Sequence, residues 1–372
     1  MRDKKEKNIL VVITTPFNIE NKPRYLQSVE NACKSFDNVD VVTYPVGKDI
    51  PKKNMEIHRV NFPFYNKTDP GPSISKAILN FFVLLKTFQL VLKNDYSVIQ
   101  GEDVEAGVIA NIVGKTLGVK TIYSLYNPFG ETLKPYGLST ILVPLIIPTE
   151  FFLNNFSDVI LTEWEYDKTK LKERYKHKDI LHVPDLVGTV VTKPDYEVKK
   201  EYIVYSGNFK KYQGVDLLLD AFESVKKEID LDLVLIGQPT NQIIEGINSK
   251  GLGDRVHLVG LRTKPEANYL ISKASFSVMP RIKDGPPSLK GVHYLSWNKV
   301  VLATDLDCNR KLLKNGWNSI LVNSKKEDFA EGIKRLVKEK NLLKNLEKNI
   351  KSDNRKDVLQ NDDLDDLYRE LS

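Results

Sequence analysis

The chain has 372 residues, of which 41% are hydrophobic and 28% are charged, and its formal net charge is +6 at pH 7. This length is too great for one ordinary core and fits two globular domains. Basic residues alternate with acids instead of forming a basic arm, which argues against nucleic acid as a partner. Cys33 and Cys308 lie far apart and form no CxxC pair, so neither a disulfide framework nor a zinc site is expected.

The N-terminal apolar run has the length of one strand, which is too short for the core of a signal peptide. A cytoplasmic location is therefore expected. The five histidines, His58, His177, His182, His257 and His293, show no paired spacing of the HExxH kind, so no metal is predicted.

The first half of the chain alternates strand patterns with helix patterns. Strands are predicted over 9–14, 39–44, 55–60, 97–100, 120–125 and 158–162, and helices over 24–36, 75–93 and the segment that ends at Leu117. A loop rich in Pro, Gly and Asn is expected over 65–75. Such alternation predicts an α/β domain with a doubly wound parallel sheet.

Two segments of the first half are unusually apolar. In the helix 75–93, apolar residues at three- and four-residue spacing predict one broad buried stripe, made of Ile78, Phe81, Phe82, Leu85, Phe88 and Leu92. The segment 137–154 is interrupted by Pro144 and Pro148 and is too broken for a transmembrane helix of roughly 20 residues.

Two interpretations of the segment 137–154 stay open. It forms a pair of buried helices, or it forms a surface that dips into a bilayer to reach a lipid-linked substrate. In the second case the helix 75–93, with Lys76, Lys86 and Lys93, would share that surface.

A linker with Pro and Lys is predicted over 191–201, and the β-α-β pattern then restarts. Strands are expected over 202–205, 231–236, 256–258, 276–279, 300–303 and 320–322, and helices over 214–228, 265–272, 288–297 and 327–339, before a charged helical tail. The predicted domains are therefore residues 1–196 and 197–372.

The stretch from Met279 to Thr304 organises the second domain. It reads as a strand end, a Gly/Pro loop that carries Arg281 and Asp284, a short helix and another strand. The first turn of such a helix leaves backbone N–H groups unpaired and positively polarised. A loop of this kind between parallel strands therefore predicts a phosphate site.

Five sequence segments of the second half resemble the nucleotide-sugar-binding domain of family 4 glycosyltransferases of the GT-B fold. They are YSGNFKKYQGVDLLLDAF, LVLIG, GLGDRVHLVG, PRIKDGPPSLKGVHYLSWNKVVLATD and NGWNSILV. The first half is similar to the acceptor-binding domain of that family through GPSISKAILN, YSVIQGEDVEAGVIA and TIYSLYNPFGE. The resemblance implies two Rossmann-like, doubly wound domains that face a central cleft, with the acceptor domain first.

A glycosyl donor has a nucleotide diphosphate as its leaving group, so the site must stabilise the charge that develops on it. Arg281 and Lys290 suit that role, together with the backbone N–H groups of Ser288 and Leu289. By the resemblance, Asp284 takes the place of the acid that faces the donor sugar. The other residues expected on the donor side are Gly207, Asn208, Gln213, Gly285 and His293.

On the acceptor side, Glu102, Asp103 and Glu105 follow a predicted strand end and are candidates for binding acceptor hydroxyls, with Tyr126 and Asn127 nearby in the motif. Each assignment has a structural alternative. Arg281 and Lys290 could form surface ion pairs, Asp284 could serve a turn or a helix N-cap, and the acids could be solvated loop residues.

Several positions depart from the family pattern. Ser288 looks like an insertion between Asp284 and His293, and Asn298 and Val300 replace a usual Gly and Pro. His293 stands where the family has a glutamate for the ribose, Gln213 where it often has a lysine, and Tyr126 where many members have a histidine. A neutral imidazole accepts one hydrogen bond where a carboxylate accepts two, so ribose binding is expected to differ.

The DxD pairs Asp230/Asp232 and Asp305/Asp307 flank strands, where capping or turn roles are expected instead of metal-bound nucleotide chemistry.

The resemblance implies transfer of a hexosyl group with retention of configuration from a UDP- or GDP-sugar co-substrate, with no cofactor or metal. The expected partners are the nucleotide sugar and a glycan or lipid-linked acceptor, with a peripheral contact at the inner membrane face. Two alternatives remain: a non-catalytic GT-B protein that binds glycan or stabilises a partner, and a GT-B sugar-nucleotide epimerase.

Overall fold

The computed structural model describes residues 6–17, 23–47, 49, 52–62, 65, 73–134, 137–138, 140–176, 178–183, 190–352 and 362–371. Most of the loop predicted over 65–75, and His177, lie outside these residues. The chain divides into two compact units. The first unit contains Met1–Leu133, Gly137–Leu186 and Gln360–Ser372, and the second contains Lys134–Tyr136 and Val187–Leu359.

The first unit is built on a seven-stranded parallel sheet with the order β3-β2-β1-β4-β5-β6-β7. Its strands are β1 Asn8–Ile13, β2 Asn38–Thr43, β3 Met55–Arg59, β4 Val98–Glu102, β5 Lys120–Leu125, β6 Val159–Thr162 and β7 Asp179–His182. Its helices are α1 Pro23–Ser35, α2 Ile74–Lys93, α3 Val104–Leu117, α4 Phe129–Leu133, α5 Val143–Phe156, α6 Glu165–Arg174 and α14 Asp362–Leu371.

Both faces of this sheet are covered, which explains the unbroken apolar run of β1. Ile9 and Val11 pack toward α1 and α14, whereas Leu10 and Val12 pack toward α2 and α3. The strand order reverses between β1 and β4, so the carboxyl ends of these two strands flank the switch point of the sheet. Ligands of open α/β sheets bind at such points.

The second unit has a six-stranded parallel sheet with the order β10-β9-β8-β11-β12-β13. Its strands are β8 Tyr202–Ser206, β9 Asp232–Ile236, β10 Val256–Gly260, β11 Ser277–Met279, β12 Val301–Thr304 and β13 Ser319–Val322. Its helices are α7 Val215–Val225, α8 Asn241–Ser249, α9 Lys264–Lys273, α10 Leu289–Ser296, α11 Asp307–Arg310, α12 Lys326–Lys338 and α13 Lys340–Ser352, with a short 3-10 helix, η2 Lys211–Gln213. Its switch point lies between β8 and β11.

The predicted α/β class and the doubly wound parallel sheets are confirmed. The C-terminal tail departs from the expected arrangement, because α14 belongs to the first unit although the sequence pattern assigned residues 197–372 to the second. Leu364, Leu367 and Tyr368 of α14 are buried in the same core cluster as β1 and α1. The tail is not predicted to join the core of the first unit, because most residues of α14 are charged and its apolar side is narrow.

The prediction of a buried stripe on α2 is wrong. The buried residues of this helix are Leu79, Val83, Thr87 and Leu90. Of the six residues predicted to be buried, Phe88 alone is among those that pack against the core, and the other five are exposed. The described residues of the segment 137–154 likewise form no pair of buried helices. They contribute to one helix, α5, in which only Ile146 and Leu153 are buried.

Candidate functional site

The candidate donor site lies at the switch point of the second unit. Strand β8 ends at Ser206 and is followed by Gly207, and β11 leads through Pro280 into the loop that carries Arg281. Helix α10 then begins at Leu289 and places Lys290 in its first turn. The predicted phosphate loop and the Gly207 turn therefore come together at the strand ends, as the motif spacing indicated.

Lys290 is the centre of this arrangement. Its Nζ atom donates to the Tyr205 hydroxyl at 3.0 Å and to Gln213 Oε1 at 2.7 Å. It also lies 4.5 Å from the centroid of the Tyr205 ring. The Tyr205 hydroxyl in turn donates to the Asn208 carbonyl at 2.6 Å. None of these partners is an anion, so among the described residues Lys290 has hydrogen bonds but no counter-ion.

The surroundings of Lys290 disfavour its charge. Burial and, to a smaller extent, the nearby Arg281 cation lower its pKa from an ordinary 10.5 to about 7. A buried cation without a counter-ion gains most when an anion is supplied. The site is therefore suited to an anionic ligand.

Two glycines make room for this cluster. A Cβ atom at Gly207, whose φ is +147°, would lie 2.9 Å from Lys290 Nζ. At Gly214, with φ +70°, it would lie 1.9 Å from the Pro280 carbonyl oxygen. Only glycine fits both positions without a shift of backbone or of the lysine. The two glycines thus allow the backbone to lie close to Lys290 and to Pro280.

Arg281 is almost fully buried. Its Nε atom donates to the Lys283 carbonyl at 2.7 Å and its guanidinium NH1 to the Pro286 carbonyl at 2.8 Å. The guanidinium also lies 5.4 Å from the centroid of the Tyr212 ring. These bonds use two of the five guanidinium donors and fix the shape of the loop before α10. The surface ion pair offered as its alternative is absent from the described interactions of this side chain.

Asp284 faces the start of α11. Its Oδ1 atom accepts from the backbone N–H of Cys308 at 2.9 Å. Burial raises the pKa of Asp284, but the hydrogen bonds from Cys308 and from the backbone of Gly285 outweigh it and hold the pKa below its ordinary value. This is the capping geometry that the sequence left open beside a role at the donor sugar.

The remaining donor-side residues lie around the same loop and helix. Gly285 is buried, Ser288 is the N-cap of α10 and Leu289 is its first residue. In this first turn the Gly291 N–H donates to the Ser288 carbonyl at 3.0 Å, and the N–H groups of Leu289 and Lys290 have no acceptor within the helix. Asn208 is exposed, whereas Gln213 is buried, and His293 lies on the partly buried side of α10.

The acceptor-side residues gather at the switch point of the first unit. Glu102 ends β4 and is 1% exposed. Its Oε1 accepts from the Ser28 hydroxyl at 2.5 Å and from Gln100 Nε2 at 2.8 Å, and its Oε2 accepts a short hydrogen bond from the Tyr126 hydroxyl. Burial raises the pKa of Glu102, and these donors oppose the shift. Glu102 thus organises protein side chains and is not a solvated loop acid.

Asp103, Glu105 and Asn127 differ in their surroundings. Asp103 has a φ of +74°, rare for a residue other than glycine, and its Oδ1 caps α3 through the Val104 N–H at 2.9 Å. Glu105 pairs with Lys76 at 2.5 Å. Asn127 Oδ1 is buried and has no hydrogen-bond partner among the described residues. A strained acid and an unpaired amide oxygen so close to a switch point favour a ligand-binding role.

A small cavity of about 40 Å³ opens beside this network within the first unit. Its lining includes Arg24, Ser28, Tyr126, Glu163 and Tyr368. Arg24 pairs with Glu163 at 3.3 Å and lies 4.6 Å from the centroid of the Tyr126 ring. This volume is enough for water and too small for a sugar.

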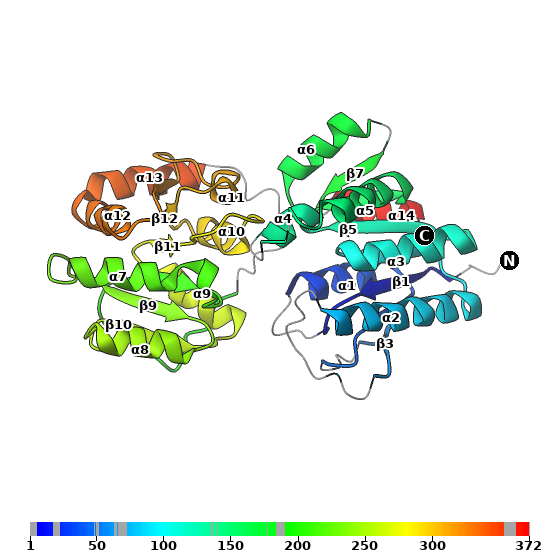
Figure 1. Cartoon of the computed structure of the whole chain (residues 1–372), viewed down its shortest axis with the longest axis horizontal. Helices are drawn as coiled ribbons and strands as arrows, with labels where there is room; N and C mark the ends of the chain where they lie inside the picture. The colour runs from blue at the N-terminus through cyan, green and yellow to red at the C-terminus, as the bar shows by residue number, and fades with distance from the viewer. Residues whose placement is uncertain are drawn as a thin grey trace. The chain divides into compact units, whose positions relative to one another are not determined.

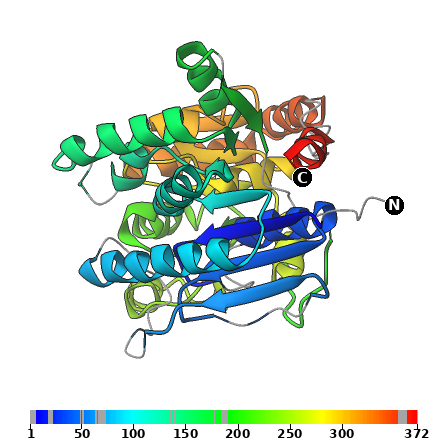
Figure 2. The same ribbon diagram turned by 90° about the vertical axis from the view of Figure 1, so that its right-hand side faces the viewer.

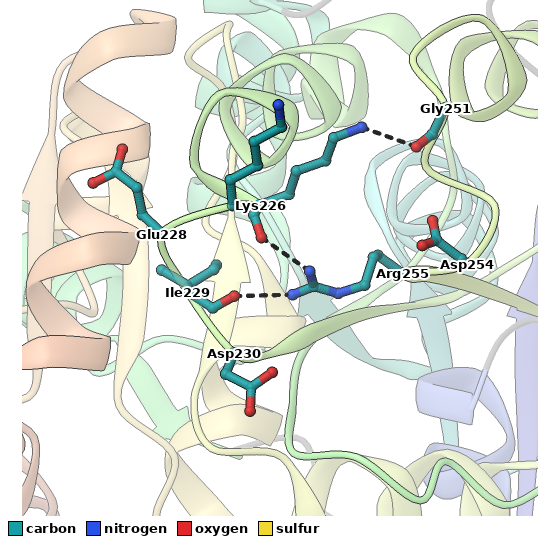
Figure 3. Close-up of a pocket in the computed structure, with 8 residues that line it drawn as sticks. Lys226, Glu228, Ile229, Asp230, Gly251, Asp254 and Arg255 are labelled. Carbon is teal, nitrogen blue, oxygen red and sulfur yellow. Dashed lines mark hydrogen bonds between the residues drawn. The ribbon is translucent and has the colours of Figure 1, made fainter.

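The larger hollow of the second unit, about 560 Å³, lies elsewhere (Figure 3). Arg255 lines it and donates to the carbonyls of Lys226 and Ile229 and to the Asp232 carboxylate. These residues precede or begin strands β9 and β10, at the edge of the sheet opposite the carboxyl ends. The hollow is open and its arginine has a structural role, so it is not the candidate site.

Aspartates of both DxD pairs form ion pairs with side chains of the second unit. Asp232 is held by Arg255 at 2.9 Å and by His257 at 2.8 Å, and Arg310 pairs with both Asp305 and Asp307. One group near the edge of the first sheet, Asp40, Glu56 and His58, has ligand atoms close enough to surround a cation. Since Asp40 already accepts from His58 and from Tyr96, this group has an internal role.

Several residues of both sites escaped the sequence patterns. In the second unit, the Tyr294 hydroxyl of α10 accepts from the Ser206 N–H at 2.7 Å and ties the helix to β8. In the first unit, the Tyr368 hydroxyl donates to Gln100 Oε1 at 2.8 Å across 268 positions of sequence. No local sequence pattern links α14 to β4, so Tyr368 could not be predicted.

Residues 191–353 match the family model of the glycosyl transferases group 1. No curated protein sequence matches the chain. Among solved structures, the chain is similar to a sucrose-phosphate synthase (tll1590) from Thermosynechococcus elongatus, with 16% identity, 98% of this chain and 99% of that chain covered, and a TM-score of 0.73.

Two other solved structures span nearly the full length. Anabaena Alr3699/HepE in complex with UDP-glucose is 13% identical, with 98% of each chain covered and a TM-score of 0.71. WaaG, a glycosyltransferase involved in lipopolysaccharide biosynthesis, is 12% identical, with 98% of this chain and 99% of that chain covered and a TM-score of 0.68. At such identities these likenesses establish the fold. The chain therefore has the predicted GT-B fold, and its residues 191–353 are similar to the glycosyl transferases group 1.

Proposed function

We propose that this protein transfers a hexosyl group from a nucleotide-diphosphate sugar to a glycan or lipid-linked acceptor, with retention of configuration and without a metal. The observation that carries the proposal is the Lys290 cation, which lies beside Arg281 at the switch point of the second unit and has no counter-ion among the described residues. The match of residues 191–353 to the glycosyl transferases group 1 supports it. UDP and UDP-glucose complexes of Alr3699/HepE, a protein of the same fold, support the donor class.

In the proposed reaction, the bond between the anomeric carbon and the diphosphate oxygen breaks, and an acceptor oxygen bonds to that carbon on the same face. The departing diphosphate takes the acceptor proton, so no side-chain base is required. Lys290 and the first-turn N–H groups of α10 stabilise the leaving charge. Arg281 holds the loop in place and adds positive potential. Glu102 and Tyr126 shape the acceptor side through their hydrogen bond.

A non-catalytic GT-B protein is the second candidate, favoured by one observation. Gln213 stands where relatives carry a cation, and its Oε1 atom occupies a donor of Lys290 at 2.7 Å. The cradle is therefore less positive than the family pattern implies. An epimerase is third, since the Asp284 carboxylate that could serve as its acid or base is held by the Cys308 N–H.

The test is a transfer assay with UDP- and GDP-hexoses, in the presence of a chelator, that monitors nucleotide release with a panel of glycan and lipid-linked acceptors. Turnover with one donor supports the proposal, and binding without turnover for any acceptor favours the non-catalytic protein. Arg281→Ala and Lys290→Ala should each weaken nucleotide affinity by roughly 1.5–3 kcal/mol, the contribution of a charge-assisted hydrogen bond. Unchanged affinity in both variants would refute the phosphate cradle.

A further inference from the structure

Thirteen of the 20 large apolar side chains that are exposed among the described residues lie on three helices of the first unit or just before one of them. Six belong to α2, one is Ile112 of α3, and six lie between Ile141 and Phe156, in and just before α5. Helix α3 packs against both α2 and α5, so these side chains share one side of the unit. Figure 1 shows α2 and α3 side by side. We call these 13 side chains the apolar surface.

The exposure is far beyond that of isolated surface residues. Phe81 and Phe151 are each 56% exposed and Ile147 is 63% exposed. Ordinary soluble proteins seldom leave contiguous apolar patches of this extent open to water, because burying them is favourable by roughly 25 cal/mol per Å². Some partner is therefore expected to cover the apolar surface.

Helix α2 is long and apolar enough to cross a membrane, and within the described part of the chain it is the one helix with that property. Only 22% of its most apolar window is buried. Yet it does not have the contacts of a spanning helix. Leu79, Val83 and Leu90 pack into the core with Leu10 and Val12 of β1. Figure 2 shows α2, in light blue, beside the blue strands of the same unit. Pulling α2 into a bilayer would uncover that face of the sheet, so α2 lies along a surface instead.

The charged residues beside the apolar surface indicate which kind of partner covers it. Helix α2 contains Lys76, Lys86 and Lys93 and no acidic residue. Lys93 is exposed, and Lys86 has a single hydrogen bond, to the neutral Gln89 at 3.4 Å. The acid of α5, Glu150, accepts from the Gly130 N–H within the unit. Lysines beside phenylalanines and aliphatic side chains fit a layer with an apolar interior and anionic headgroups.

We propose that the apolar surface is a monotopic docking face, which rests on a bilayer that contains anionic lipids and inserts the exposed side chains of α2 and α5 below the headgroups. This decides between the two interpretations that the sequence left open for the segment 137–154. The face belongs to the unit that carries the acceptor-side residues. The inference does not depend on the proposed glycosyl transfer, because the test contains no donor or acceptor.

The test is flotation of the full chain with vesicles of phosphatidylcholine alone and of phosphatidylcholine with phosphatidylglycerol. A variant with Phe81→Ser, Leu85→Ser, Ile147→Ser and Phe151→Ser removes four exposed anchors. A matched control, Ile244→Ser with Leu261→Ser, removes exposed apolar residues of the second unit. Thermal unfolding followed by circular dichroism verifies that each variant is folded.

Wild type and the control should float with the anionic vesicles, and the four-site variant should bind at least about tenfold more weakly. Lys86→Gln with Lys93→Gln should weaken binding to anionic vesicles by about fivefold per lysine, with a much smaller effect on neutral ones. Absence of wild-type binding to anionic vesicles would overturn the proposal, as would equal binding of the four-site variant. So would a dimer, seen by light scattering without lipid, that the four substitutions dissociate.

Discussion

Lys290 is a cation held in surroundings that favour its neutral form, and this property gives the donor site its chemistry. Burial and Arg281 lower its pKa, while Tyr205 and Gln213 supply hydrogen bonds without negative charge. A bound diphosphate would restore the charge and raise the pKa again. Binding should therefore be coupled to uptake of a proton by this one side chain.

That coupling predicts a pH dependence of nucleotide affinity. In the free protein Lys290 loses its proton as the pH rises through about 7. Above this value the dissociation constant should increase by up to roughly tenfold per pH unit, because Lys290 must take up a proton before it can pair with the diphosphate. A terminal phosphate with a pKa near about 6 is fully ionised in this range and adds little of its own. Calorimetric titration between about pH 6.5 and 8.5 measures the effect.

Lys290→Met is the control for this dependence. The variant should bind nucleotide weakly at every pH, and its affinity should be flat over the same interval. A wild-type affinity that stays constant up to pH 8.5 would show that the lysine is charged in the free protein, contrary to the burial of its ammonium group.

Gly207 offers a second prediction, because it is the point of closest approach of backbone to Lys290. In Gly207→Ala, the new methyl group would lie 2.9 Å from Lys290 Nζ and push the lysine aside. Nucleotide affinity should fall roughly tenfold, because the displaced lysine loses part of its charge-assisted hydrogen bond to the phosphate. The free energy of unfolding should fall by about 1 kcal/mol, because alanine is strained at a positive φ. Isothermal calorimetry and urea unfolding measure the two effects.

The matched variant is Gly260→Ala, at a φ of +73° with no atom within 4 Å of the added Cβ. It carries the backbone strain without a displaced lysine, so it should lose stability and keep nucleotide affinity. Equal affinities for the two variants would show that the space at Gly207 is not used to position Lys290.

Helix α14 links the end of the chain to the acceptor-side unit. Leu364 and Tyr368 are buried against the core of β1 and α1, and the Tyr368 hydroxyl reaches Gln100, which itself donates to Glu102. The helix therefore supports the network around Glu102 from behind. Its removal would expose apolar core and leave Gln100 without one of its partners.

Leu364→Ala should lower the free energy of unfolding of the first unit by about 2–5 kcal/mol, as expected for a truncated buried leucine. Urea unfolding monitored by a probe in that unit is the measurement. Glu370→Ala, at an exposed position of the same helix, should change stability by less than about 0.5 kcal/mol. Similar small losses in both variants would mean that α14 contributes little to the core.

The elements themselves could largely be predicted from sequence, but the orientation of α2 could not. The helix has two apolar stripes: the exposed set around Phe81 and Leu85, and the buried set Leu79, Val83 and Leu90. Both have helical spacing, so periodicity cannot decide which one faces the sheet. The bulkier stripe is the one that the sequence pattern assigns to the core. In the structure, packing against β1 buries the other stripe.

The whole molecule combines two doubly wound units whose switch points carry different chemistry. The second unit presents cations and glycines at its strand ends, and the first presents a buried carboxyl, hydroxyls and a strained aspartate. Arg281, Lys290 and Gly207 could be predicted because they lie within local motifs. Ser28, Gln100 and Tyr368 could not, because they meet Glu102 only through the topology of the sheet and the return of the C-terminal helix.

The expected location, cytoplasmic and peripheral on the inner membrane face, stays a prediction at this level. The apolar surface and its lysines are its physical basis. Membrane attachment would place acceptor-side residues near a lipid-linked acceptor, and the flotation experiment tests the attachment itself.

The central claim is that the second unit binds a nucleotide diphosphate through side-chain cations and backbone N–H groups, without a metal. Calorimetric titration with UDP, GDP, ADP and CDP tests it most directly. Each nucleotide is titrated with magnesium and with a chelator. We predict micromolar binding of one of them, UDP or GDP, that is unchanged by removal of the metal and weakened in Lys290→Ala. No binding of any nucleotide up to millimolar concentration, or binding that requires magnesium, would contradict the account.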